Sequence, residues 1–194
     1  VRLEVNPGTY TGPFTLNAPV YGVSATNTIT LDGLNPATRI VTANVGAPAI
    51  KINMVSYVTI KNLTVTNSFA GSCTGIALIG NASNQDGKCF RAISNNVNLP
   101  NVGTSTSYGI IVTGTATGLS DGNQWTDSVT IDSNTITGGY YGIQISTSGT
   151  GNALYNRGHK IRYNVLNNIY YYGMRIYYIY NAVDIIGNKI SMQT

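Results

Sequence analysis

Few residues of this chain could carry acid–base chemistry. Its 194 residues include a single histidine and seven acids. The acids are Glu4, Asp32, Asp86, Asp121, Asp127, Asp132 and Asp184. Glycoside hydrolysis typically requires two carboxyl groups that face one bond, and a calcium site requires several oxygen ligands in one place. Catalysis therefore depends on whether the fold brings some of these acids together.

The segment DGNQWTD, residues 121–127, is the best single candidate for a ligand-binding site. The side-chain oxygens of Asp121, Asn123 and Asp127 could bind a hard cation, so Ca²⁺ is the one cofactor that the sequence leaves open. Trp125, the only tryptophan, could stack on a sugar ring or cover the core. The same residue types are common in turns, and their spacing is less defined than that of a calcium loop.

The elements that would position these residues follow from an internal repeat. A small residue followed by apolar-x-apolar recurs at intervals of 26 to 34 residues. Its copies are Ala49-Ile50-Lys51-Ile52, Gly75-Ile76-Ala77-Leu78, Gly109-Ile110-Ile111-Val112, Gly142-Ile143-Gln144-Ile145 and Gly173-Met174-Arg175-Ile176. Chains that repeat at such periods usually stack one unit on the next.

A second motif lies between these copies at intervals of 24 to 39 residues. Its copies are Ile29-Thr30-Leu31, Val58-Thr59-Ile60, Phe90-Arg91-Ala92, Val129-Thr130-Ile131, His159-Lys160-Ile161 and Val183-Asp184-Ile185. Most copies are followed by an asparagine and then an apolar residue two positions later, as in Asn134-Thr135-Ile136. Asparagine suits a bend between strands because it tolerates left-handed backbone angles and its side chain can bond the local backbone.

These motifs predict an all-β fold, a single-stranded parallel β-helix of about six coils that forms one domain over residues 1–194. Period-two alternation gives short strands, and stacked strands about 4.8 Å apart place the Ile, Val and Leu residues in one continuous core. Loops of different length account for the variable spacing. A helical fold is disfavoured because the apolar residues follow no 3.6-residue period and Gly, Thr, Asn and β-branched residues are abundant.

Stacking in this register defines columns of outward side chains. The two outward columns of the Gly-motif strand are Lys51, Ala77, Ile111, Gln144, Arg175 and Asn53, Ile79, Thr113, Ser146, Tyr177. Neither column contains an acid. On the other motif the register places Lys160 beside Asp184 and Asp132 beside Arg162, so we interpret these acids as members of solvated charge ladders. His159 falls where other copies have valine, which favours a place at the start of a strand over a role as general base.

Aromatic residues suggest a different kind of site. Tyr108, Tyr140 and Tyr141 precede the glycines of their coils, beside Tyr172, and predict a tyrosine column along one corner; the chain has 14 tyrosines. Such a column could stabilise the solenoid or serve as a platform for neutral sugars. Alternation directs Arg175 and Tyr177 outward, so both are candidate ligand-binding residues. The Thr-rich segments GTSTS and TGTATG suggest ice binding only weakly, because we find no outward column in which threonine recurs.

Composition limits the partners and the compartment. The formal charge of +4 results from few acids, with 9% of residues charged, so no basic stripe dense enough for nucleic acid is expected. The most apolar tract, residues 169–186, is interrupted by Arg175 and Asp184 and is not expected to span a membrane. Cys73 and Cys89 could form one disulfide or remain buried thiols. The balance of residues favours a secreted or cell-surface protein whose N-terminus has been removed.

The motif pair GI-x-I and V-T-I-x-x-N-x-I, together with Asn6-Pro7-Gly8-Thr9-Tyr10, resembles the right-handed β-helix superfamily of pectate lyases and polygalacturonases. The resemblance implies a right-handed coil, and in composition the chain is most similar to bacterial secreted or cell-surface repeat proteins. The segment RGHKIR resembles the Gly-His and Arg-x-Lys motifs of polygalacturonases, but the partner aspartates are absent nearby.

We therefore expect a non-catalytic scaffold or adhesin segment that contacts polysaccharide or cell-surface glycan. The alternative is a polysaccharide lyase or glycoside hydrolase whose site is incomplete in this chain. The last coil ends soon after its asparagine bend, so we expect an open C-terminal edge that is covered by further coils or by another copy.

Overall fold

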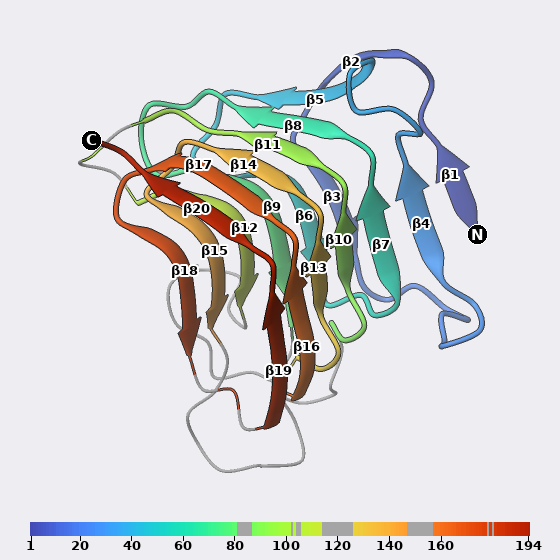
Figure 1. Ribbon diagram of the computed structural model, residues 1–194. Coiled ribbons are helices and arrows are strands. Elements are labelled where there is room, and N and C mark those ends of the chain that lie inside the picture. Colours follow the sequence, from blue (N-terminus) through green and yellow to red (C-terminus); the bar gives the residue numbers. More distant parts are fainter. Residues whose placement is uncertain are drawn as a thin grey trace.

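The chain folds into a parallel β-helix built from three sheets. The computed structural model describes residues 1–80, 87–101, 103, 106–113, 126–146, 157–177, 179 and 181–194. The described residues form twenty strands and no helix. The strands cycle through the three sheets in turn, so that each coil contributes one strand to each sheet. Figure 1 shows the coils stacked side by side, with the N-terminus at β1 and the C-terminus beyond β20, at opposite ends of the stack.

Every strand pair in the three sheets is parallel. Sheet A contains β1 (Arg2–Glu4), β4 (Ile29–Asp32), β7 (Val58–Lys61), β10 (Arg91–Ile93), β13 (Thr130–Asp132), β16 (Arg157–Arg162) and β19 (Asn181–Ile186). Sheet B contains β2 (Gly8–Thr11), β5 (Arg39–Ala43), β8 (Thr64–Asn67), β11 (Asn96–Asn98), β14 (Thr135–Thr137), β17 (Val165–Ile169) and β20 (Lys189–Met192). Sheet C contains β3 (Phe14–Asn17), β6 (Pro48–Asn53), β9 (Thr74–Ile79), β12 (Tyr108–Thr113), β15 (Tyr141–Ser146) and β18 (Tyr172–Tyr177).

The register confirms the predicted stacking. The Gly motif forms the later strands of sheet C, with Ile76 opposite Ile110, Ile110 opposite Ile143 and Ile143 opposite Met174. The second motif forms sheet A, and the segment after the asparagine forms sheet B. The structure has six three-stranded coils and two strands of a seventh. The sequence motifs miss β3 because Phe14 stands opposite Ile50 without a preceding glycine.

The glycines of the Gly motif are required by close packing inside the coil. A Cβ on Gly109 would lie 2.4 Å from Ile136 Cγ2 and 2.5 Å from the carbonyl oxygen of Gly142. Gly75 and Gly142 face the carbonyl oxygen of the following glycine in the same way, at 2.7 and 2.5 Å. These distances are far below van der Waals contact, so sheet C can approach the apolar side chains of sheet B only where the side chain is absent.

The asparagines between sheets A and B form a buried ladder. The backbone N–H and Nδ2 of Asn95 both donate to Asn134 Oδ1 at 3.0 Å, and Asn134 donates in the same way to Asn164 at 3.0 Å. Asn164 continues the ladder to Asn188 at 2.9 Å. Each Nδ2 also donates to a carbonyl oxygen of sheet A, such as Ala92 O at 2.9 Å from Asn134. The ladder therefore satisfies polar backbone groups that the bend would otherwise leave buried without partners.

The ladder corrects one detail of the sequence interpretation. The left-handed residue at this bend precedes the ladder position, with φ of 54° at Ser94, 56° at Ser133 and 53° at Tyr163. The asparagines themselves are selected for their side-chain amides, not for their backbone angles. Both ends of the coil expose inward-facing apolar residues, including Leu3 and Phe14 at one end and Ile185 and Ile190 at the other.

Candidate functional site

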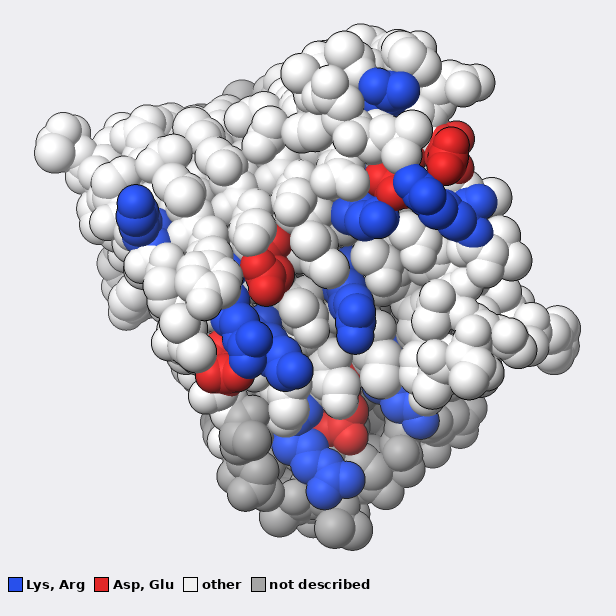
Figure 2. Space-filling model, turned by 45° about the vertical axis from the view of Figure 1, so that its right-hand side comes forward, with Lys and Arg blue, Asp and Glu red and all other residues white. Residues whose placement is uncertain are grey.

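Most of the described charged residues lie on or beside the outer face of sheet A. This face comes forward in Figure 2, where acidic and basic side chains alternate over it. Asp32 is the most buried acid of the face, with 1% of its surface exposed. Its Oδ2 accepts ion pairs from Arg2 Nη2 at 2.8 Å and Lys61 Nζ at 3.0 Å, and its Oδ1 accepts hydrogen bonds from Asn62 Nδ2 and the Leu34 N–H, both at 2.8 Å.

These contacts identify Asp32 as a structural carboxylate. Burial alone would raise its pKa, but the hydrogen bonds from Asn62, Leu34 and Lys61 outweigh burial and lower the pKa to about 2. A carboxylate held ionised by four donors from different elements cannot readily exchange protons with a substrate near neutral pH.

The other described acids also contact the protein. Asp127 Oδ1 accepts the Arg157 N–H at 3.0 Å, and its backbone carbonyl accepts the Cys89 N–H at 2.8 Å, so Asp127 caps a corner between coils. Lys160 and Arg162 stand opposite Asp184 and Asp132 as predicted, but Asp184 forms its ion pair with Arg162 instead of Lys160. Among the described residues, no three of His, Cys, Asp and Glu cluster closely enough to hold a metal ion.

The predicted site around residues 121–127 is only partly described. Asp121, Asn123 and Trp125 lie outside the described residues, so the Ca²⁺ site and the sugar-stacking role of Trp125 stay predictions. Thr126 is buried and Asp127 is half-buried. The capping contacts of Asp127 leave its Oδ2 only a long contact to Arg157 Nε, at 3.9 Å.

His159 lies inside the coil, at the inward position where Val58, Val129 and Val183 also lie. The structure buries it completely, and neither Nδ1 nor Nε2 has a hydrogen-bond partner among the described residues. Burial lowers its pKa to about 4, and the charge of Asp127 only weakly opposes the shift. A neutral imidazole sealed in the core cannot reach a substrate, which agrees with the place at the start of a strand inferred from the sequence.

The outer face of sheet C is not the open surface that the alternation pattern suggested. Ala77, Ile111 and Gln144 do occupy one outward column, as the register shows. All three are fully buried, and Ala77 and Ile111 pack with Tyr108 and Tyr141 in a second apolar cluster outside the main core. Period-two alternation predicts which way a side chain points, but it does not predict whether other residues cover that face of the sheet. The acid-free face is therefore a poor candidate for a substrate cleft.

A tyrosine cluster lies at the corner between sheets B and C, as the sequence predicts. The rings of Tyr108, Tyr141 and Tyr172 form a stacked column, with centroid separations of 5.1 and 5.9 Å. Tyr140 and Tyr171 pack against this column, with their centroids 5.0 Å apart. Tyr170 lies 5.3 Å from Tyr140. We call these six residues the tyrosine cluster.

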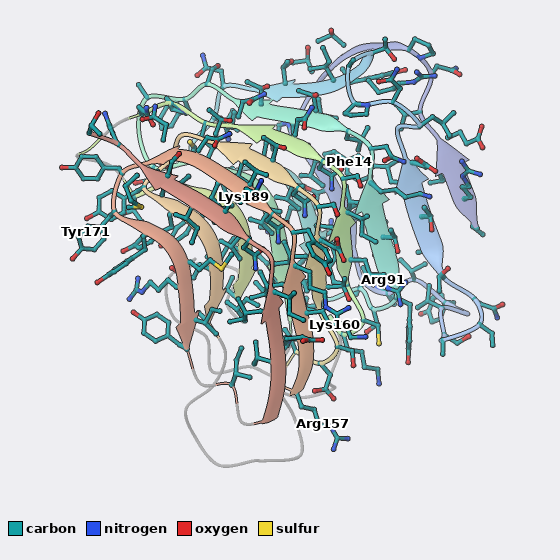
Figure 3. The ribbon with its side chains drawn as sticks, viewed as in Figure 1. Phe14, Arg91, Arg157, Lys160, Tyr171 and Lys189 are labelled. Carbon is teal, nitrogen blue, oxygen red and sulfur yellow. The ribbon has the colours of Figure 1, made fainter. Side chains whose placement is uncertain are left out.

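The outer part of the tyrosine cluster is open to solvent. Tyr170, Tyr171 and Tyr172 are 44%, 48% and 44% exposed, whereas Tyr108 and Tyr141 beneath them are buried. Figure 3 shows Tyr171 projecting from the edge of the molecule, on the side away from Arg91. Buried rings thus fix the position of exposed rings, which leaves a preformed aromatic surface.

Arg175 and Tyr177, two of the predicted ligand-binding residues, lie next to the tyrosine cluster. Arg175 donates from Nη1 to the Tyr141 hydroxyl at 3.1 Å and from Nε to the Tyr177 hydroxyl. Its guanidinium lies 4.3 Å from the Tyr177 ring centre and 5.2 Å from that of Tyr141. The structure therefore brings Arg175 and Tyr177 together with the tyrosine cluster, but it does not bring them together with Asp127.

Sheet B shows that threonine does recur in outward columns, contrary to the sequence analysis. One column of sheet B contains Thr64, Asn96 and Thr135 in register, and the next contains Thr66, Asn98 and Thr137. The segments GTSTS and TGTATG do not reveal these columns, because successive members of a column lie one coil apart, 32 or 39 residues along the chain. This regular hydroxyl and amide surface satisfies the register condition for an ice-binding array, but no other feature of the described residues of this face indicates a ligand.

The two cysteines are free thiols in the structure, which resolves the alternatives that the sequence left open. Burial raises the pKa of Cys73 to about 11, so this thiol is unreactive near neutral pH. The described part of the chain contains no helix that is long and apolar enough to cross a membrane.

Comparison with known proteins gives no match. No family model, no curated protein and no solved structure is significantly similar to this chain. The class of protein is therefore defined by the fold alone: a parallel β-solenoid with three strands in each coil.

Proposed function

We propose that this chain is a non-catalytic scaffold or adhesin segment of a secreted or cell-surface protein, and that it contacts neutral glycans through the tyrosine cluster. The main support is the exposure of Tyr170 and Tyr171 beside the stacked column of Tyr108, Tyr141 and Tyr172. Aromatic rings that are held in place bind the apolar face of a sugar ring without losing much conformational entropy. Arg175 adds hydrogen-bond donors beside these rings.

The ion pairs and hydrogen bonds that the acids form within the protein support a non-catalytic role. Asp32 is saturated with donors, Asp127 caps a corner, and Asp184 is paired with Arg162. Glycoside hydrolysis needs two carboxyl groups across one bond. Glu4 and Asp32 do stand opposite each other on β1 and β4, but both pair with Arg2 and Asp32 is buried. The three parallel sheets in cyclic order also support our proposal that the chain belongs to the pectate-lyase-like β-helix superfamily.

Binding measurements with matched variants test the glycan contact. We expect neutral polysaccharides such as xyloglucan or mixed-linkage glucan to retard the protein in affinity electrophoresis. Tyr171→Ala should weaken this binding by roughly fivefold, since stacking on one aromatic ring contributes about 1 kcal/mol. Tyr21→Ala removes a tyrosine that is even more exposed, 90% against 48% for Tyr171, lies far from the tyrosine cluster in sequence and serves as control. Equal effects of the two substitutions would contradict a site at the tyrosine cluster.

A polysaccharide lyase or hydrolase of the same superfamily is the second candidate. It requires acids from outside the described residues, such as Asp121, to converge with Asp127. Incubation with a panel of polysaccharides, followed by assays for reducing ends and for unsaturated products, separates the two functions. Turnover that is lost in both Asp121→Asn and Asp127→Asn would establish the enzyme and refute the scaffold.

We also propose that the end of the solenoid at β19 and β20 is covered in the intact protein, by further coils or by another copy. Ile185, Ile190 and Met192 are exposed there although they continue the inward columns of Ile161, Leu166 and Ile169. Natural solenoids cover such edges. Sedimentation of the chain with and without an Ile190→Lys substitution tests self-association at this end. If both proteins sediment as monomers, another copy is ruled out and further coils are the cover that we propose.

A further inference from the structure

A polar groove runs across the outer face of sheet A near the N-terminal coils. Two adjoining cavities of about 400 and 470 Å³ share Tyr57 in their lining. The floor consists of Thr30, Thr59 and Arg91 from three successive strands of sheet A. One wall is the segment around Ala18–Thr28, and the opposite wall is the corner that contains Tyr57 and Lys88. We call this feature the sheet A groove.

The charge of the sheet A groove is positive. Lys61, Lys88 and Arg91 line it, and no acid among the described residues does. Asp32, the acid beside it, is already neutralised by Arg2 and Lys61. Arg91 is exposed and makes no ion pair among the described residues. Lys88 lies 6.0 Å from the centre of the Tyr57 ring. An unpaired guanidinium in a concave site is a donor group without an acceptor, which is the condition for binding an anion.

The arrangement of donors favours a tetrahedral anion over a planar one. Arg91 comes from β10 and Lys88 from the corner before β10, and Lys61 of β7, although paired with Asp32, adds a third cationic donor from another strand. Sulfate and phosphate esters offer three terminal oxygens that can accept from such separate donors at once, whereas a carboxylate is planar and best suits a single bidentate arginine. The hydroxyls of Thr28, Thr30 and Thr59 add uncharged hydrogen-bond partners, and the Tyr57 ring offers an aromatic face for a sugar.

We propose that the sheet A groove binds a sulfate or phosphate ester carried on a sugar chain, with Arg91 as its main anion contact. The groove is separate from the tyrosine cluster, since Arg91 and Tyr171 lie on opposite sides of the molecule in Figure 3. The proposal therefore extends beyond the contact with neutral glycans, and either site can fail in a test while the other remains.

Calorimetric titration at physiological salt tests the proposal with four probes. These are a heparin oligosaccharide for sulfate, a phosphorylated mannan oligosaccharide for phosphate, an oligogalacturonate for carboxylate and a xylo-oligosaccharide as the neutral sugar. We expect at least one of the two esters to bind more tightly than both oligogalacturonate and the neutral sugar. Which ester binds identifies the source of the anion.

Two substitutions that remove the same charge from the same column provide the control. Arg91 and Lys160 are both exposed on sheet A, two strands apart, and only Arg91 lines the groove. Arg91→Gln should weaken ester binding by roughly tenfold or more, the effect of a lost charge-assisted hydrogen bond. Lys160→Gln should change it by less than about threefold, as for a distant surface charge. Lys88→Gln is the second groove variant, in case Arg91→Gln unfolds the protein.

Three results would overturn the proposal. The first is that neither ester binds. The second is that oligogalacturonate binds as tightly as the esters, which would indicate a site for any anion. The third is that Lys160→Gln weakens binding as much as the groove variants do, which would assign binding to the overall charge of the face.

Discussion

Replacing His159 with valine should make the protein less sensitive to acid. The imidazole is fully buried without hydrogen-bond partners among the described residues, and its pKa is lowered from 6.5 to about 4. The unfolded chain therefore begins to bind a proton at His159 below about pH 6.5, whereas the folded chain does not bind it until about pH 4. Because a depressed pKa in the folded state favours unfolding as the pH falls, stability is intact above pH 6.5 and decreases below it.

The size of this effect follows from the pKa shift. Each unit of difference between folded and unfolded pKa is worth about 1.4 kcal/mol, so the free energy of unfolding should fall by about 3 kcal/mol between pH 7 and pH 4 on account of His159 alone. Valine occupies the same inward position at Val58, Val129 and Val183, so the coil accepts it there. At pH 7 the His159→Val protein should be equally stable or more stable by up to about 2 kcal/mol, because two unsatisfied nitrogens are removed while a small void is created.

Urea unfolding of both proteins at half-unit steps from pH 7 to pH 4 measures the effect. The carboxyl groups titrate in the same range, but they contribute equally to both proteins and cancel in the difference. That difference should grow by about 2–3 kcal/mol as the pH falls to 4.5. His159→Leu, which fills more of the volume, controls for the void. Parallel stability curves for wild type and both variants would refute a buried, neutral His159.

Three further substitutions test the internal framework. Gly109→Ala should cost at least about 2 kcal/mol of unfolding free energy in urea titrations, because the added Cβ would meet Ile136 Cγ2 at 2.4 Å and the Gly142 carbonyl oxygen at 2.5 Å. A near-neutral change would contradict the close packing of sheets B and C. Asn134→Ala should cost about 3 kcal/mol or more of unfolding free energy, since it leaves buried donors of Asn95 without an acceptor. Asn188→Ala, at the more exposed end of the ladder, should cost less. Equal costs for the two substitutions would argue against a ladder. Asp32→Asn should remove about 2 kcal/mol of stability, a contribution that is present above pH 3.8 and is lost as the pH falls through about 2. Acid titrations that coincide for wild type and variant would show that the carboxylate is not held ionised.

The sequence predicts the fold well because the structure of each coil is local and repeated. Three motifs recur in fixed order, and parallel stacking allows only one register that keeps Ile76, Ile110 and Ile143 in one column. The Gly motif does not extend to β3, because Pro13 stands before Phe14 where the other copies have alanine or glycine. For the Asn ladder, the positions and the bonding of the side chains to backbone groups agree with the sequence analysis, whereas the left-handed backbone angles fall on the preceding residues.

The candidate sites were harder to predict because function on a solenoid depends on its outer faces. Alternation correctly directed Arg175 and Tyr177 outward and His159 inward. It could not show that Ala77, Ile111 and Gln144 are buried, since alternation predicts only the direction of a side chain. The sheet A groove was missed for the same reason: Arg91 is read as one of several outward charges until the segment around Ala18–Thr28 is seen to form a wall beside it.

Inward-facing residues fix the stacking while outward-facing residues are free to vary, which explains how one solenoid can carry three different outer surfaces. The interior is constrained at almost every position by the Gly109 column, the Asn134 ladder and the inward apolar residues, so the stacking does not depend on what the outer columns contain. Outward side chains contribute at most about 1 kcal/mol per cross-strand pair, which leaves them free to differ from sheet to sheet. Sheet A has become charged, sheet B bears uncharged hydroxyls and amides, and the corner of sheet C presents tyrosines. If the proposed glycan contact holds, a ligand that is itself a chain of repeating sugars would contact several coils at once, and its affinity would gain from every coil that it crosses.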